Sequence, residues 1–178
     1  MSGRRFLPGQ AELWRVYATG HYGMALLAYA PVGFVLLETA PLLAFLGGGV
    51  VLSLATLPDV DMRIPFVPHR GPTHSLLFLA LVAGVLGAAG FLLGQGSWQP
   101  LGGAVRGAVF GVVLGTVGIG SHLLADALTP MGVNVFWPVP ADRFSLSVAR
   151  ADNTLANYGL LFVGAAATAG VLVLSGYV

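Results

Sequence analysis

The segment at residues 56–76, TLPDVDMRIPFVPHRGPTHSL, contains two aspartates, two histidines and two arginines. Charged residues make up only 8% of the chain, so this concentration of ionisable side chains indicates a chemical role. Asp59 and Asp61 follow a helix-ending proline, and an extended Asp-x-Asp presents its two carboxylates close together. Imidazole nitrogens and carboxylate oxygens are common ligands of divalent metals, so the segment predicts part of a metal site.

The two histidines of this segment flank a break in the chain at Gly71 and Pro72. Thr73 follows the break and has the side chain of a helix N-cap. We therefore expect a helix to begin at Thr73, with His74 in its first turn and His69 just outside it.

His122 and Asp126, in SHLLADAL, are four residues apart, which puts both side chains on one face of a helix. An aspartate deep in a membrane costs roughly 2.5 kcal/mol or more, so an apolar segment should not keep one without a partner. The two side chains can chelate one cation, or they can form a hydrogen-bonded pair between helices.

Seven side chains in all are candidate metal ligands, and every histidine of the chain is among them. The candidates are His21, Asp59, Asp61, His69, His74, His122 and Asp126. Because the chain has no cysteine, a metal must bind to nitrogen and oxygen, which suits Zn, Mn, Fe or Ni. Taken singly, these residues have plainer explanations, such as an interfacial histidine or a solvated loop carboxylate.

Seven candidates exceed the four ligands of one tetrahedral ion, whereas two ions sharing a bridging carboxylate would use them all. A two-metal centre commonly activates water and holds the oxygens of a phosphoester during in-line displacement. Asp59 or Asp61, if not fully engaged by metal, would act as general base. Arg70 is suited to hold a phosphate oxygen with two hydrogen bonds, and is equally consistent with an ordinary cytoplasmic-loop arginine.

The overall composition is that of a membrane protein. Hydrophobic residues make up 56% of the 178 residues, and the mean hydropathy is +0.85. Soluble domains carry about 25% charged residues, so most of this chain's surface should face lipid. The absence of cysteine and lysine excludes disulfides, thiol nucleophiles and Schiff-base chemistry.

No apolar run before residue 21 resembles a cleavable signal, so the first hydrophobic segment is expected to remain as an anchor.

Hydropathy predicts an all-α membrane bundle of about five transmembrane segments. The apolar stretches cover residues 22–37, 41–57, 75–94, 104–128 and 155–176. The first two are short for a full span, and a proline lies in the LLETAPLL between them, so we expect a helical hairpin. Gly107, Gly111 and Gly115 share one helix face, a spacing that lets helices approach closely.

The placement of arginine predicts the orientation of this bundle. With five spans, seven arginines fall on one side of the membrane and only Arg106 falls on the other. The seven are Arg4, Arg5, Arg15, Arg63, Arg70, Arg143 and Arg150. The positive-inside rule therefore puts the N-terminus in the cytoplasm and the C-terminus outside. All candidate ligands fall on that cytoplasmic face, although the arginines alone set the topology, and this coincidence favours a metal site.

Four blocks of the chain resemble the successive signature blocks of the YdjM-like membrane-bound metal-dependent hydrolases. These blocks are GHYGMALLAY, LPDVD, HRGPTHSLL and SHLLADALTPMGVNVFWP; they occur in family order and cover residues 20 to about 146. The resemblance implies a multi-span helical protein with a divalent-metal hydrolase site, and all seven candidate ligands fall on the family's motif positions. The chain departs from the family pattern at two places near the edge of the expected site. Met62 stands where a histidine often follows the PDxD block, and only seven residues separate Asp61 from His69.

At the level of fold, the family resembles helical phosphoesterases of the zinc-dependent phospholipase C type. By that resemblance, Asp126 would bridge two zinc ions, with His74 and His122 on one ion and His21 on the other. Fold-level likeness alone is a weak guide to substrate.

We therefore predict that residues 1–178 form one integral membrane domain, a metal-dependent hydrolase of the cell membrane that acts on a lipid or lipid-linked phosphoester at the cytoplasmic face. Its expected cofactors are one to two or more divalent ions per chain, zinc first, and no nucleic acid is expected as a partner. The alternatives are a structural metal site, or a metal transporter or sensor, which would need ligands at mid-membrane. The loop at residues 129–154 is either a lid or headgroup platform, using Trp137 and Arg143, or a plain connection.

Overall fold

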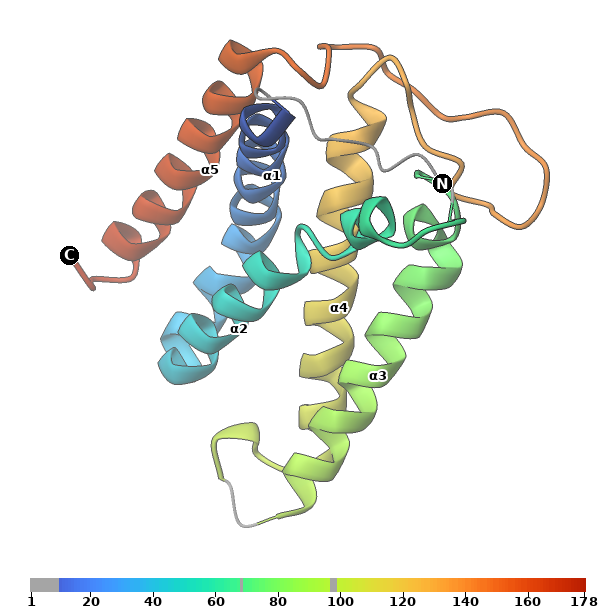
Figure 1. Ribbon diagram of the computed structural model, residues 1–178. Helices are drawn as coiled ribbons and strands as arrows, with labels where there is room; N and C mark the ends of the chain where they lie inside the picture. The colour runs from blue at the N-terminus through green and yellow to red at the C-terminus, as the bar shows by residue number, and fades with distance from the viewer. Residues whose placement is uncertain (1–9, 68, 97–98) are drawn as a thin grey trace.

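The computed structural model describes residues 10–67, 69–96 and 99–178, and these residues form an all-helical protein (Figure 1). The α-helices are α1 Gln10–Thr39, α2 Pro41–Leu54, α3 Leu76–Gln95, α4 Ala104–Ala127 and α5 Thr154–Leu174. Short 3₁₀ helices lie between them: η1 Pro58–Arg63, η2 Pro72–His74 and η3 Gln99–Leu101. Within the described residues the one extended pairing is an isolated bridge between Val133 and Phe144.

Five helical segments are long and apolar enough to cross a membrane, which confirms the predicted number of spans. The first candidate span is Ala18–Thr39, and the second, Pro41–Arg63, runs through α2 and η1. The α5 span is peripheral, since only 6% of it is buried inside the protein. The orientation in the membrane stays a prediction, and two of the arginines that predict it, Arg4 and Arg5, lie outside the described residues.

The first two helices form the hairpin that their short apolar stretches predicted. Ala40 alone separates α1 from α2, and Pro41 occupies the first position of α2, where a proline does not disturb a helix. The hydroxyl of Tyr29 on α1 donates a hydrogen bond of 2.7 Å to the carbonyl oxygen of Ala44 on α2. Helix α1 itself begins at Gln10, well before the apolar stretch expected at residue 22.

Helix α4 lies at the centre of the bundle, in contact with α1, α2 and α3 (Figure 1). Small residues allow its close contact with α3. A Cβ on Gly107 would collide with the carbonyl oxygen of Gly90, and a Cβ on Gly111 would collide with that of Leu86. The prediction that these glycines serve helix packing is confirmed. The close approach also brings the residues just before α3 against the last turns of α4.

Helix α3 begins at Leu76, and its N-cap is Ser75, whose hydroxyl oxygen accepts a hydrogen bond of 3.1 Å from the backbone N–H of Phe78. The expectation that Thr73 caps this helix is therefore wrong, and His74 ends η2 instead of lying in the first turn of α3. The hydroxyl of Thr73 instead donates a hydrogen bond of 2.7 Å to Oδ2 of Asp61, because the η2 turn packs against η1.

Candidate metal centre

Side chains from α1, η1, η2 and α4 converge at one end of the bundle. His21 comes from α1, Asp59 from η1, His74 from η2, and both His122 and Asp126 from the last turns of α4. Both His74 and His122 are fully buried, and His21 and Asp126 are nearly so. Five of the seven predicted ligands, from separate parts of the sequence, therefore meet in one cluster.

Four ligand atoms form the inner part of this cluster. Nε2 of His74 lies 3.1 Å from Nε2 of His122. Oδ2 of Asp126 lies 3.3 Å and 3.5 Å from these two nitrogens, and Oδ1 of Asp59 lies 3.5 Å and 3.6 Å from them. Atoms bound at roughly 2.0–2.1 Å to a tetrahedral zinc ion are about 3.3–3.4 Å apart. These five separations are therefore compatible with the spacing of ligand atoms around one tetrahedral ion.

The protonation of the two inner histidines supports this interpretation. Nδ1 of His122 lies 2.7 Å from the carbonyl oxygen of Ala55, and Nδ1 of His74 lies 3.0 Å from the Thr73 hydroxyl oxygen and 3.2 Å from Oδ2 of Asp61. The Ala55 carbonyl can only accept, and the Thr73 hydroxyl gives its proton to Asp61, so the neutral form of either ring would carry its proton on Nδ1 and its lone pair on Nε2. Two lone pairs 3.1 Å apart repel each other. A shared proton or a metal cation relieves this repulsion, and the neighbouring carboxylates stabilise the positive charge of either one.

One carboxylate oxygen of Asp126 is independent evidence that the cluster binds an ion. Its Oδ2 atom is buried and accepts no hydrogen bond among the described residues. Buried polar atoms without partners are uncommon, because their desolvation is left uncompensated. This oxygen faces Nε2 of both His74 and His122, so an ion bound to the two nitrogens would also satisfy it.

His21 faces the other side of the same two carboxylates. Its Nε2 atom lies 3.9 Å from Oδ2 of Asp59 and 4.0 Å from Oδ1 of Asp126. The ring of His21 also stacks on that of His122, with centroids 4.0 Å apart and planes inclined by 12°. Each aspartate therefore has one oxygen near His74 and His122 and one oxygen near His21, an arrangement that suits a second ion beside the first.

Asp61 and His69 form an adjacent group around the other nitrogen of His74. Nδ1 of His69 lies 3.0 Å from Oδ1 of Asp61, and Oδ2 of Asp61 accepts from the Thr73 hydroxyl at 2.7 Å. An ion bound in this group would need Nδ1 of His74, whereas the inner cluster uses Nε2. One neutral imidazole has a single lone pair, so it cannot serve both. The geometry favours Asp61, together with the Thr73 hydroxyl that donates to it, as the group that orients His74, and such outer partners are usual for metal-binding histidines.

Arg70 is buried beside Asp126, with only 4% of its surface exposed. Its Nη2 atom donates a hydrogen bond of 2.5 Å to Oδ1 of Asp126. Its Nη1 atom donates hydrogen bonds of 2.9 Å to the Thr129 hydroxyl and to the Gly132 carbonyl oxygen. The guanidinium therefore orients Asp126 and ties the loop after α4 to the cluster. Contact of Arg70 with a phosphate stays a prediction.

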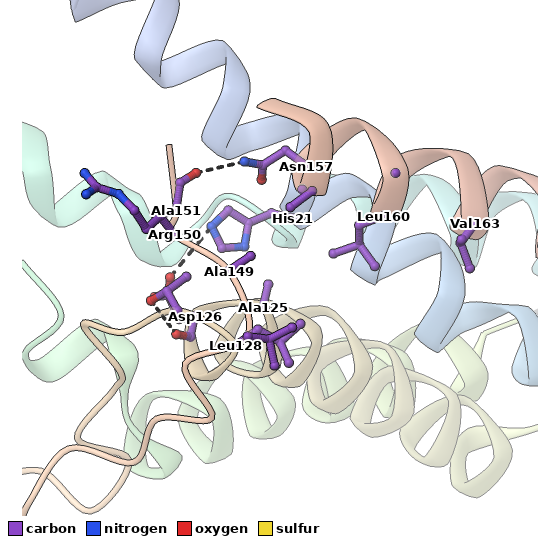
Figure 2. Close-up of a pocket in the computed structure, with 15 residues that line it drawn as sticks. His21, Ala125, Asp126, Leu128, Ala149, Arg150, Ala151, Asn157, Leu160 and Val163 are labelled. Carbon is purple, nitrogen blue, oxygen red and sulfur yellow. Dashed lines mark hydrogen bonds and ion pairs between the residues drawn. The ribbon is translucent and has the colours of Figure 1, made fainter. Parts of the chain in front are cut away.

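A cavity of about 320 Å³ adjoins the cluster, with His21 and Asp126 in its wall (Figure 2). The remaining wall comes from the end of α4, residues 148–151 and the first half of α5. The loop between α4 and α5 passes over this end of the bundle (Figure 1), and the backbone N–H of Val148 donates a hydrogen bond of 2.8 Å to the carbonyl oxygen of Leu128. Trp137 of this loop is partly buried and Arg143 is exposed; their roles at lipid headgroups stay predictions.

Sequence reasoning did not identify Ala55 or Thr129 as parts of this site. Ala55 acts through its backbone carbonyl, which no pattern of side chains can reveal. Thr129 is the second residue after α4, and its place in the ADALTPMG stretch was an available signal, because hydroxyls near helix ends commonly bind nearby polar groups.

Comparison with protein-family models matches residues 17–177 to the family described as YdjM inner membrane protein. The match includes all of the candidate ligands. The chain belongs to the YdjM inner membrane protein family. No curated protein and no solved structure matched the chain, so the likeness to phospholipase C type phosphoesterases stays a prediction.

Membership of the YdjM family and the five apolar helices together identify a multi-pass membrane protein in contact with the lipid bilayer. The all-helical fold predicted from hydropathy is confirmed. The buried histidines and aspartates of this YdjM protein could bind a metal ion, since their ligand atoms lie within 4.8 Å of one another in each of three groups.

Substitution of Asp61 tests whether its carboxylate orients His74 for metal binding. Asp61→Asn is expected to weaken Zn²⁺ binding by roughly tenfold to a hundredfold, because His74 loses the carboxylate that orients its ring. Competition with a chromophoric chelator in detergent measures the affinity. Asp142→Asn, on the exposed loop, is the matched control and should bind as the wild type does. Unchanged affinity would contradict the orienting role, and loss of one whole equivalent of zinc would show Asp61 to be a ligand.

Proposed function

We propose that this YdjM-family protein is a divalent-metal-dependent hydrolase that cleaves phosphoesters of membrane lipids or lipid-linked molecules. The observation that carries the proposal is the position of two aspartates among three histidines. Asp59 and Asp126 each have one oxygen near His74 and His122 and the other near His21. Carboxylates shared in this way can hold two ions at the short separation used by two-metal phosphoesterases.

The proposed ligand set has five members, and zinc suits its nitrogen and oxygen atoms, with Mn, Fe and Ni as alternatives. His74 and His122 would hold the inner ion, His21 would hold the outer ion, and Asp59 and Asp126 would contribute to both. When bound, such a pair of ions polarises a phosphoryl oxygen and brings the pKa of water toward neutrality. In this assignment Asp61 and His69 support the ligand set from outside.

Two side chains of the chain would act on the attacking water and on the geometry of the centre. Asp59 has a side chain that is 18% exposed, whereas that of Asp61 is fully buried and uses both oxygens in hydrogen bonds. Of the two, Asp59 is therefore the one that water can reach, and we assign proton removal to Asp59 in the form in which one of its oxygens is not bound to a metal. Arg70 acts as a positioning residue, because its guanidinium is bonded to Asp126 and to the following loop.

A structural metal site is the second candidate, and the complete burial of His74 and His122 favours it. Structural zinc sites are coordinatively closed, whereas catalytic sites keep one position open. The cavity against His21 and Asp126 supports the catalytic alternative, because it gives a substrate access to one side of the cluster. Transport is less well supported, since the ligands gather at one end of the bundle instead of along a path through it.

We place this end of the bundle at the cytoplasmic face, within one integral membrane domain that spans residues 1–178. Arg63, Arg70, Arg143 and Arg150 belong to the connections at the same end as the cluster, whereas Arg106 lies in the first turn of α4, at the other end (Figure 1). The positive-inside rule assigns the arginine-rich end to the cytoplasm.

Cysteine labelling tests this orientation without background, because the chain has no cysteine of its own. Asp142→Cys lies in the loop after α4, and Gly96→Cys follows α3 at the opposite end. A membrane-impermeant maleimide should label Gly96→Cys in intact cells, and should label Asp142→Cys only after the membrane is opened. The reverse pattern would put the cluster on the outer face.

Loss of a shared carboxylate tests the hydrolase itself. Purified protein should cleave a phosphomonoester or phosphodiester lipid in a chelator-sensitive manner. Asp126→Asn should lower this rate by about a hundredfold or more, because interactions worth several kcal/mol in the transition state are lost. Asp142→Asn should leave the rate unchanged. Full metal occupancy with no turnover of either lipid class would contradict the proposal and favour a structural site.

A further inference from the structure

The cavity beside the cluster has chemically different ends. His21 and Asp126 lie at one end, and Leu160 and Val163 of α5 lie at the other (Figure 2). Leu128 and Ala125 add further apolar surface from the end of α4. Such a cavity combines a polar end, next to the proposed metal ligands, with an extended apolar wall. This is the pattern of a site for an amphiphilic molecule.

The apolar end of the cavity lies in the part of the chain that crosses the membrane. Its wall includes residues 156–163 of α5, within the candidate span Thr154–Leu174. This helix is hardly buried by the rest of the protein, and Val163 is 50% exposed. The medium next to this wall is therefore lipid. An acyl chain can reach the cavity from the bilayer without crossing water.

A polar contact joins the loop side of the cavity wall to α5. The side-chain amide of Asn157 donates a hydrogen bond of 2.8 Å to the carbonyl oxygen of Ala151 (Figure 2), and another of 2.8 Å to that of Asn153. Residues 148–151 are held against α5 in this way, between the cavity and the aqueous end of the bundle. The lipid side is consequently the more direct way in for an apolar group.

We propose that this cavity binds the head-proximal part of one acyl chain of a membrane phospholipid, whose phosphate then lies against His21 and Asp126. The inference rests on the proposed function, because it names the class of substrate and its direction of entry. A volume of about 320 Å³ is at the low end of ligand cavities, roughly 300–1,000 Å³, and suits a segment of one chain. The substrate thus enters sideways from the leaflet, between α4 and α5.

Gly159 is an exposed residue of the cavity wall at which a side chain can be added. It lines the cavity, and no atom lies within 4 Å of the position that a Cβ would take. A larger side chain is therefore accommodated without a collision, and would occupy the space assigned to the acyl chain. Gly170, on the same helix but outside the cavity, is equally unobstructed and provides a matched control.

Photocrosslinking tests the proposal without requiring turnover. The full chain in lipid nanodiscs is given phosphatidic acid with a diazirine in one acyl chain, before any metal is added, and the adducts are mapped by peptide mass spectrometry. In the wild type, adducts should concentrate on Leu160 and Val163. Each methylene excluded from an apolar site weakens binding about fourfold, so Gly159→Leu should lower these adducts roughly tenfold. Gly170→Leu should not change them, and Gly159→Ala should have a smaller effect if the leucine variant does not fold.

The outcomes of this experiment separate the cavity from the chemistry. Adducts spread evenly over the lipid-facing helices, or unchanged in both Gly159 variants, would overturn the acyl-chain site whatever the activity. Concentrated adducts that Gly159→Leu removes support the site. If the wild type then hydrolyses no phospholipid with Zn²⁺ present, the lipid site stands and the hydrolase proposal fails. Thermal unfolding of each variant shows that a loss of adducts does not come from unfolding.

Discussion

The rest of this structure depends on one constraint: each buried candidate ligand must be held in its orientation by a second polar group. Imidazole and carboxylate groups are costly within an apolar bundle, so each must be bonded in a single orientation. Asp61 holds His74, the carbonyl of Ala55 holds His122, and Arg70 holds Asp126. The three supporting residues, Ala55, Asp61 and Arg70, all lie in the connection from α2 to α3. This explains why the connection is rich in ionisable residues although the chain as a whole is apolar.

Helix packing supplies the framework that these contacts need. The glycines of α4 let α3 approach closely, so that the η1 and η2 turns reach the last turns of α4. By contrast, α5 packs mainly on α1 and leaves much of its surface to lipid. The cluster is therefore enclosed on the α2–α3 side and bordered by a cavity on the α5 side. A site closed by protein on one side and adjoining lipid on the other is suited to a membrane-borne substrate.

Much of this could be predicted from the sequence, since hydropathy gave the five spans and the spacing of His122 and Asp126 gave a shared helix face. The sequence also predicted that histidines and aspartates from separate segments come together, and the structure brings them into three groups of ligand atoms within 4.8 Å. The separate roles of Asp59 and Asp61 could not be predicted, because the two residues look equivalent in sequence, whereas in the structure they face different nitrogens of His74. Thr73 had the pattern of a helix cap, but the tertiary contact with Asp61 takes its hydroxyl.

Anomalous X-ray diffraction at the zinc edge, on crystals of the zinc-loaded protein, tests the central claim most directly. Two shared carboxylates predict two zinc ions about 3.5–4 Å apart, one on His74 and His122 and the other on His21. Both ions should be in reach of Asp59 and Asp126. A zinc ion bound instead to Asp61 and His69, or no ion within bonding distance of His21, would contradict a two-metal centre.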